Sequence, residues 1–171
     1  PNYEEIYPNE PVQISAGPVG DLYEGASRPG HFAGVLTVVN RLFEIVKPSA
    51  AVFGEKDFQQ LWLIKNHFKK IEISFMPTVR EFDGLALSSR NIRLTESDRA
   101  AALIISKALK EPARMQEILA TQPAFKLDYA EIIDEKTFQL ASATTQNKRA
   151  IIAGWVNGVR LLDNAVVESN S

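Results

Sequence analysis

Residues 54–60 combine charged and amide side chains at a point where a strand is predicted to meet a helix. Lys56 supplies a cation, Asp57 an acceptor and Gln60 an amide, and at ~100° per residue the three fall within about 100° of arc on one helical face. Gly54 lets a ligand approach the backbone, and the start of the helix offers unpaired N–H groups to an anion. The segment is therefore a candidate anion site, although a charged pair at a helix start also occurs on solvated surfaces.

A second group of polar side chains lies in residues 85–91, a loop rich in hydroxyl groups. Ser88 and Ser89 supply two hydroxyls, and Arg90 supplies a guanidinium that can hold phosphate oxygens with two hydrogen bonds. Successive backbone N–H groups in such a loop add further donors. The same residues also fit a polar loop whose serines cap the next turn, so a phosphate site and a capped turn are both possible interpretations.

Other residues offer weaker signals for chemistry. His31 could act as a general acid or contact a ligand, because imidazole titrates near neutral pH, and it could equally cap the helix that follows. His67 lies among lysines near a predicted helix end, where a surface position is expected. Trp62 and Trp155 are expected to pack rather than to stack on bases. The acidic residues lack metal-ligand spacing, so no metal site built from protein side chains is expected.

The first half of the chain is predicted to alternate helices and strands. In order, the predicted elements are a helix over residues 32–46, a strand over 50–53, a helix over 56–68 and a strand over 71–76. Pro48, Gly54 and Pro77 end three of them. This alternation is typical of a parallel α/β sheet. Because two strands do not make a stable domain, we expect the rest of the sheet upstream of Pro1.

The second half of the chain does not continue this alternation of helices and strands, and we place a domain boundary near Pro77 and Thr78. Thr95 and Asp98 have the spacing of a capping box at the start of a helix that runs to about residue 110. Residues 111–124 contain two prolines and predict no firm element. Strands are expected over residues 127–134, 149–156 and 159–164. Asn157-Gly158 joins the last two as a hairpin, so residues 78–171 are expected to form an α+β domain with a small antiparallel sheet.

Composition excludes several classes of function. The 171 residues are 45% hydrophobic and 23% charged, which favours a packed core over disorder. A net charge of -2 argues against a nucleic-acid partner bound through overall positive charge. The absence of cysteine excludes disulfides, thiolate metal sites and thiol catalysis. No run approaches the roughly 18 apolar residues of a membrane span. We therefore expect a soluble cytoplasmic protein without a membrane partner.

Five segments, taken together and in this order, resemble the pantothenate synthetase family. They are Arg28-Pro29-Gly30-His31-Phe32, Phe53-Gly54-Glu55-Lys56-Asp57 with Gln59-Gln60-Leu61, Pro77-Thr78-Val79-Arg80-Glu81, Leu87-Ser88-Ser89-Arg90-Asn91 and Arg160-Leu161-Leu162-Asp163-Asn164. Each segment alone is a weak signal, whereas five in register make an accidental match improbable. The resemblance covers nearly the whole chain.

The resemblance implies an α/β fold and an ATP-dependent ligase. Residues 1–77 would be part of the Rossmann-like parallel sheet of an adenylylating nucleotidyltransferase, and residues 78–171 a carboxyl-terminal α+β domain with an antiparallel sheet. The carboxylate of pantoate would attack the α-phosphorus of Mg-ATP and expel pyrophosphate. The amine of β-alanine would then attack the pantoyl-adenylate and release AMP and pantothenate. ATP, Mg²⁺ and the two small substrates are thus the expected ligands, and a cytosolic homodimer is the expected assembly.

The resemblance also implies roles for individual residues. The implied ATP contacts are Gly54, Glu55, Lys56, Asp57, Val79, Leu87, Ser88, Ser89 and Arg90. Among these, the implied catalytic residues are Lys56, which neutralises phosphate charge in the transition state, and Ser88, Ser89 and Arg90, which hold the β- and γ-phosphates. Asp57 would reach the ribose, Val79 would offer backbone to adenine, and Gln60 would hydrogen-bond pantoate.

The chain departs from the family in two respects. The histidine-rich ATP signature of the first βα turn and an upstream substrate-binding glutamine are both absent, and the stretch between Lys110 and Leu127 is shorter than expected. Two other functions therefore remain open: another adenylyl- or cytidylyltransferase, and a non-catalytic dimerisation or binding remnant. Pantoate-dependent pyrophosphate exchange discriminates the first, and the residues encoded upstream of Pro1 discriminate the second.

Overall fold

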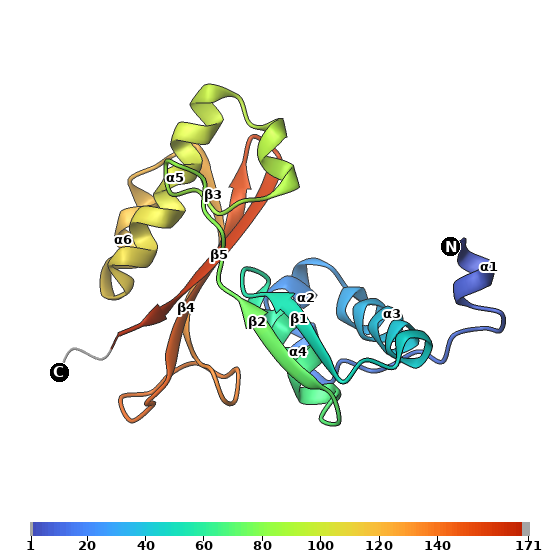
Figure 1. Cartoon of the computed structure of the whole chain (residues 1–171). Helices are drawn as coiled ribbons and strands as arrows, with labels where there is room; N and C mark the ends of the chain where they lie inside the picture. Colours follow the sequence, from blue (N-terminus) through green and yellow to red (C-terminus); the bar gives the residue numbers. More distant parts are fainter. Residues whose placement is uncertain (1, 169–171) are drawn as a thin grey trace. The chain divides into compact units, whose positions relative to one another are not determined.

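The computed structural model describes residues 2–168, which divide after Pro77 into two compact units. Unit 1 ends at Pro77 and contains a parallel pair of strands with helices (Figure 1). Unit 2 begins at Thr78 and contains a three-stranded antiparallel sheet with helices. The predicted fold class, a parallel α/β portion followed by an α+β portion, is confirmed. None of the helices in the described residues is long and apolar enough to cross a membrane.

Unit 1 follows the predicted alternation of helices and strands. Its elements are the helices α1 (Tyr3–Ile6), η1 (Pro18–Asp21), α2 (Glu24–Ser27), α3 (His31–Val46) and α4 (Phe58–His67), and the strands β1 (Ala50–Gly54) and β2 (Glu72–Met76). The strands pair in parallel, with Ala50 opposite Glu72 and Gly54 opposite Met76. Helix α4 is the crossover between them, so the β1–α4–β2 segment is one βαβ unit.

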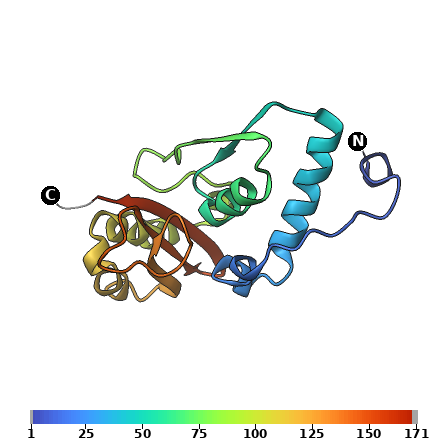
Figure 2. The ribbon, with the colours of Figure 1, turned by 90° about the horizontal axis from the view of Figure 1, so that it is seen from below.

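Helix α3, which Figure 2 draws in blue to cyan, departs from the burial expected for its apolar stripe. Phe32 and Leu36, in its first half, are buried, as the helical period predicts. Farther along, Leu42 and Val46 are 42% and 68% exposed, and Val52 on β1 is 61% exposed. The period of the sequence identified the apolar face of the helix, whereas the amount of that face that is covered depends on what packs against it.

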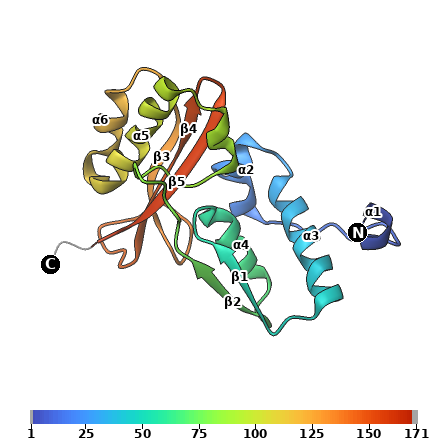
Figure 3. The ribbon, with the colours of Figure 1, turned by 45° about the horizontal axis from the view of Figure 1, so that its top comes forward.

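Unit 2 places its two α-helices on one face of its sheet (Figures 1 and 3). Its elements are η2 (Ser89–Arg93), α5 (Glu96–Lys110), η3 (Pro112–Arg114), α6 (Met115–Ala120), β3 (Phe125–Asp134), β4 (Lys148–Val156) and β5 (Val159–Val167). The strand order is β3-β4-β5, with β4 in the centre and almost wholly buried. Ala102 on α5 and Leu119 on α6 pack with Ile152 on β4 in one hydrophobic core.

Two local predictions in unit 2 are confirmed in detail. Thr95 and Asp98 form the capping box of α5: the Thr95 side chain accepts from the Asp98 backbone N–H, and the Asp98 carboxylate accepts from that of Thr95. Asn157 and Gly158 both have positive φ, 47° and 74°, as the tight turn of the β4–β5 hairpin requires. Residues 111–124, for which no element was predicted, contain η3 and α6.

One glycine in the central strand is required by close packing. A Cβ atom at Gly154 would lie 2.4 Å from the Phe125 ring and 2.5 Å from the Lys126 carbonyl oxygen. Any larger residue would therefore push β3 away from β4. This close approach lies near the end of the sheet at which β4 turns into β5.

Candidate functional site

The first candidate segment forms the turn between β1 and α4 in unit 1. Gly54 is the last residue of β1, and the backbone N–H of Glu55 donates to the Met76 carbonyl at 2.9 Å, so strand pairing continues one residue farther. A Cβ atom at Gly54 would meet no other atom within 4 Å. The backbone at the carboxyl end of β1 therefore has open space beside it, which suits ligand binding at the end of a parallel strand.

The three charged residues of this segment, Glu55, Lys56 and Asp57, lie in the turn and not on the helix. Helix α4 begins at Phe58, and its N-cap Asp57 has non-helical φ and ψ of -89° and 62°. The prediction that Lys56, Asp57 and Gln60 share a helical face is therefore wrong for the first two. The helical angle per residue applies only inside the helix, and here the chain turns for three residues before α4 starts.

Lys56 and Asp57 form an ion pair in this turn. The Lys56 Nζ lies 3.6 Å from the Asp57 Oδ1, and the two side chains are 20% and 54% exposed. The Asp57 side chain makes no capping hydrogen bond to α4. The turn thus presents an ammonium and a carboxylate side by side at the start of a ten-residue helix, whose N-terminal N–H groups favour anions.

The two adjacent glutamines of α4 have different environments. Gln59 is buried: its Oε1 accepts from the Glu24 backbone N–H at 3.1 Å, and its Nε2 donates to the carbonyls of Val19 and Leu22, both at 2.8 Å. Gln60, which the sequence analysis assigns to pantoate, is only partly buried. Gln59 was missed as a structural residue, although its position four residues before the buried Leu63 indicates the core face of the helix.

The second candidate segment, residues 85–91, begins in a short hairpin of unit 2 that spans residues 79–87. The Leu87 backbone N–H donates to the Val79 carbonyl at 2.8 Å, and the Glu81 N–H donates to the Leu85 carbonyl at the same distance. Val79 and Leu87, two of the implied ATP contacts, are thereby held side by side, and their side chains are 63% and 54% exposed. The Val79 carbonyl keeps a second lone pair for a further donor.

Ser88, Ser89 and Arg90 follow the hairpin and start η2. Ser88 is the N-cap, and its hydroxyl oxygen accepts from the Arg90 backbone N–H at 3.2 Å. The capping interpretation is thus correct for Ser88. It does not exclude a phosphate contact, because the cap uses the hydroxyl oxygen only as an acceptor and leaves the O–H to donate. Arg90 Nη1 lies 3.5 Å from the Arg160 carbonyl oxygen, and Ser89 is exposed.

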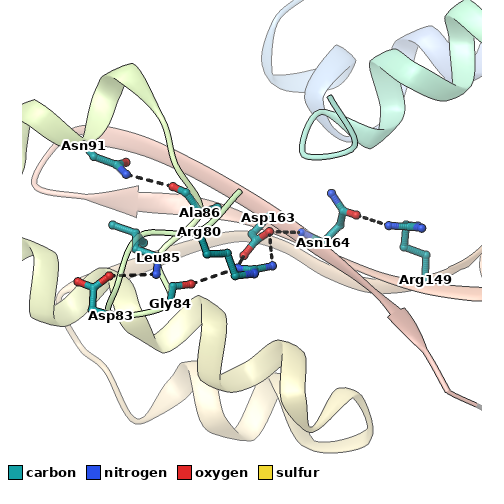
Figure 4. A network of polar contacts seen from close by, with 9 residues as sticks. All are labelled: Arg80, Asp83, Gly84, Leu85, Ala86, Asn91, Arg149, Asp163 and Asn164. Atoms are coloured by element: carbon teal, nitrogen blue, oxygen red, sulfur yellow. Dashed lines mark hydrogen bonds and ion pairs between the residues drawn. The ribbon is translucent and has the colours of Figure 1, made fainter. Parts of the chain in front are cut away.

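A network of ion pairs and hydrogen bonds holds the hairpin to the sheet and to α5, and Figure 4 shows the part of it that joins Arg80 to Asp163. Arg80 binds Asp163 on β5 through two contacts of 2.6 and 3.1 Å, and Asp163 is almost fully buried. Arg99 on α5 donates to Glu81 at 2.7 Å and to Asp83 at 2.6 Å. These partners lie 83, 18 and 16 residues apart in the chain, so no local spacing rule predicts them.

The same contacts shift the ionisation of two carboxyl groups. The pKa of Glu81 is lowered by hydrogen bonds from Arg99 and then Asn91, and the pKa of Asp83 is lowered chiefly by its hydrogen bond from Arg99. The pKa of Arg99 is raised by the same two carboxylates. Both carboxylates therefore stabilise the folded state when they are ionised. Protonation removes this stabilisation.

We predict from these shifts that the melting temperature of unit 2 falls on acidification. The stabilisation by the two carboxylates is complete above the pKa of about 4 that such groups have in the unfolded chain. It is lost as the pH falls through their lower pKa values in the folded state. Circular dichroism melts between pH 7 and pH 2 measure this. A double variant, Glu81→Gln with Asp83→Asn, should be less stable at pH 7 and less sensitive to acid. An acid dependence as steep as that of the wild type would contradict the assignment.

The remaining candidates are placed as follows. His31 is the first residue of α3, and its Nε2 lies 2.9 Å from Arg28 Nη1, so it takes part in a local contact at the helix start. His67 is exposed at the end of α4, as expected. Among residues 2–168, no cluster of three or more His, Cys, Asp or Glu side chains could hold a metal ion.

The fold is that of a mixed α/β protein with a polar candidate segment in each of its two units. The pantoate–β-alanine ligase family model matches residues 1–166. Pantothenate synthetase of Saccharopolyspora erythraea is 44% identical over 98% of the chain, and that of Acidothermus cellulolyticus is 43% identical over 96%. The chain belongs to the pantoate–β-alanine ligase family.

Solved structures support the same assignment. The crystal structure of pantothenate synthetase from Thermus thermophilus is similar with a TM-score of 0.89 and 40% identity, over 96% of this chain and 67% of that one. A pantoate–β-alanine ligase from Francisella tularensis, complexed with beta-gamma ATP and β-alanine, is similar with a TM-score of 0.71 and 32% identity, over 95% and 61% of the two chains. The chain spans about three fifths of the length of the first two relatives, 60% and 61%.

Proposed function

We propose that the intact protein containing this chain joins pantoate to β-alanine in an ATP-dependent reaction. The observation that carries the proposal is the family match over residues 1–166. It is supported by the Francisella tularensis relative, whose structure holds beta-gamma ATP and β-alanine. Most residues of this chain that the family resemblance implicates lie in two segments whose chemistry suits phosphate, the β1–α4 turn and residues 87–90. Gln60 lies on α4, and Val79 pairs with Leu87 in the hairpin.

The proposed reaction has two steps. A carboxylate oxygen of pantoate attacks the α-phosphorus of ATP, the bond to the β-phosphate oxygen breaks, and pyrophosphate leaves. The amine of β-alanine then attacks the acyl carbon of the pantoyl-adenylate, loses a proton, and expels AMP as the amide bond forms. Phosphoryl chemistry of this kind depends mainly on positioning and on stabilisation of charge, which is what the two segments can supply.

In unit 1 the β1–α4 turn is proposed to contact ATP and pantoate. The Lys56 ammonium would neutralise negative charge that develops on phosphate oxygens, and the open space beside Gly54 would let the nucleotide approach the backbone. Asp57, 54% exposed, would accept hydrogen bonds from the ribose, with Glu55 beside it in the turn. Gln60, one turn into α4, would hydrogen-bond pantoate.

In unit 2 the hairpin and residues 88–90 are proposed to contact the nucleotide as well. Val79 would hold adenine through its backbone, next to Leu87, which is paired with it. Ser88 and Ser89 would donate hydroxyl hydrogens to phosphate oxygens, and Arg90 would bind two of those oxygens at once. Each of these contacts uses donor capacity that the local capping bond of Ser88 does not consume.

Mg²⁺ is proposed to enter together with ATP. Residues 2–168 contain no cluster of three or more potential protein ligands for a metal ion. Mg²⁺ commonly binds through substrate phosphates and water with only one or two carboxylates. The residues proposed to contact ATP therefore fit the ion as part of the nucleotide complex. The bound ion would reduce the charge of the triphosphate.

The resemblance supports three further proposals about the whole protein. Residues 1–77 are proposed to be part of its nucleotide-binding domain and residues 78–171 its carboxyl-terminal domain. The protein is proposed to be a cytoplasmic homodimer that acts on small molecules without nucleic-acid or membrane partners. Analytical ultracentrifugation of the intact protein measures the assembly.

Pantoate-dependent exchange of labelled pyrophosphate into ATP tests the function. The intact protein should catalyse exchange only when pantoate is present, and β-alanine should then convert the adenylate into pantothenate and AMP. Exchange driven by another acid or nucleotide would identify a different adenylyl- or cytidylyltransferase. No exchange with any acid would indicate a non-catalytic binding module.

Gln60→Leu is expected to weaken pantoate binding selectively. The substitution leaves polar groups of the bound acid without a partner, at ~1–3 kcal/mol, so the dissociation constant for pantoate should rise about 5- to 150-fold while ATP binding is retained. Calorimetric titration of both ligands measures this. Gln59→Leu provides a contrast, because the loss of the three hydrogen bonds of this buried side chain should lower the melting temperature instead. Weakened ATP binding with intact pantoate binding would reject the assignment of Gln60.

A further inference from the structure

Residues 88–90 have few internal contacts that could hold them in place. The Ser88 hydroxyl accepts from the Arg90 N–H, and the Ser88 carbonyl accepts from the Asn91 N–H at 3.0 Å. The first bond is the side-chain cap of η2 and the second is a backbone bond of this short 3₁₀-helix, an element with poorer hydrogen-bond geometry than an α-helix. Contacts outside the turn must therefore set the position of its hydroxyls and guanidinium relative to the sheet.

Asn91 ties the two ends of this segment together. Its side chain is buried, and its Nδ2 donates to the Ala86 carbonyl at 3.0 Å and to Glu81 Oε1 at 2.6 Å. Ala86 precedes the segment and Asn91 follows it, so the amide closes residues 87–90 into a loop. A reversed amide would place its oxygen against a carboxylate and a carbonyl, so the two acceptors also determine the orientation of the Asn91 side chain.

Glu81 connects this loop to the rest of unit 2. One carboxylate oxygen accepts from Asn91 and the other from Arg99 on α5, at 2.7 Å. Arg99 also binds Asp83, and the neighbouring Arg80 binds the buried Asp163 on β5 (Figure 4). The carboxylate of Glu81 is thus the link between a helix of the core and the residue that closes the loop.

We propose that Asn91 and Glu81 are positioning residues that hold residues 88–90 in the geometry needed for phosphate. The inference rests on the proposed function and adds to it two residues that do not themselves contact the nucleotide. Donors aimed at developing charge must be held within about 0.5 Å of their productive positions. A loop tied through one amide and one carboxylate loses that precision when either is removed.

Asn91→Ala tests the proposal in the intact protein. We expect KM for ATP to rise about 10-fold and kcat to fall by a similar factor, with KM for pantoate within twofold of the wild type. Gln116→Ala is the matched control, because Gln116 also donates its side-chain amide to a main-chain carbonyl of unit 2, that of Ala130 at 3.2 Å. The control should leave all three constants within twofold.

A reversal of polarity separates positioning from simple loss of packing. Asn91→Asp puts acceptors against acceptors and should lower kcat/KM for ATP more than Asn91→Ala does. Adding Glu81→Gln restores one bond, because the new amide can donate to position 91 while its oxygen still accepts from Arg99. The double variant should recover at least threefold in kcat/KM for ATP over Asn91→Asp alone.

Three results decide the matter. If the wild type shows pantoate-dependent exchange and Asn91→Ala behaves like the Gln116→Ala control, the positioning role is rejected while the function stands. If the wild type shows no exchange, the proposed function itself fails. If Asn91→Ala does not fold, Glu81→Gln alone replaces it, since one oxygen cannot serve both Asn91 and Arg99; an unchanged KM for ATP in that variant would overturn the proposal.

Discussion

Lys56→Ala is expected to lower the rate of adenylate formation by at least ~100-fold. A charge-assisted contact contributes about 1.5–3 kcal/mol, and one that tightens as charge develops on phosphate contributes more to the transition state than to binding. A hundredfold loss corresponds to about 2.7 kcal/mol of transition-state stabilisation. The loss should appear mainly in kcat, measured by single-turnover release of pyrophosphate with ATP, Mg²⁺ and pantoate.

Lys69→Ala is the matched control for this prediction. Lys69 is an exposed lysine of the same unit, and its Nζ donates to the Asn66 side chain at 3.0 Å. Its removal should change the rate by less than twofold and the melting temperature hardly at all. Lys56→Ala should also retain the wild-type circular dichroism spectrum, because its partner Asp57 is half exposed and tolerates the loss. A rate within threefold of the wild type would remove Lys56 from the mechanism.

Arg90→Lys is expected to weaken ATP binding about 10- to 100-fold even though the charge is kept. The planar guanidinium can hold two phosphate oxygens at once, whereas an ammonium is a point charge that cannot reproduce this grip. Arg90 also reaches the Arg160 carbonyl at 3.5 Å, which orients the guanidinium, and a lysine has a different reach and geometry. Calorimetric titration with a non-hydrolysable ATP analogue in the presence of Mg²⁺ measures the effect.

Arg93→Lys provides the comparison, since Arg93 is an exposed arginine of the same 3₁₀-helix. It should bind ATP within twofold of the wild type. Pantoate binding should be unaffected by either substitution. Equal loss of both ligands in Arg90→Lys would indicate damage to the fold rather than to a phosphate contact.

The ion pairs of the hairpin also bear on how the site is built. Arg80 with Asp163, and Arg99 with Glu81 and Asp83, join a loop to a strand and a helix of the core. Because Asp163 is almost fully buried, removal of Arg80 would leave a charge without its partner, which usually costs more than the pair itself contributes. These ion pairs fix the hairpin to two elements of the core, which suits the phosphate contact proposed for residues 88–90.

The amino-acid sequence by itself determined the features that depend on neighbouring residues. The capping box at Thr95, the tight turn at Asn157 and Gly158, and the alternation of helices and strands before Pro77 all arise from interactions within a few residues. The types and spacing of residues 54–60 and 85–91 also predict anion-binding chemistry, and this stays a prediction. Local propensity and periodicity are sufficient for such features.

Only the tertiary structure decided which side chains support the candidate segments. It placed Lys56 and Asp57 in a turn before α4, and it buried Gln59 rather than Gln60. It also showed that Glu81 links Asn91 to Arg99. These two partners lie 10 and 18 residues from Glu81 in the chain. Such contacts form because the packing of helices and strands brings distant residues to the same point, and no periodic pattern in the sequence records that distance.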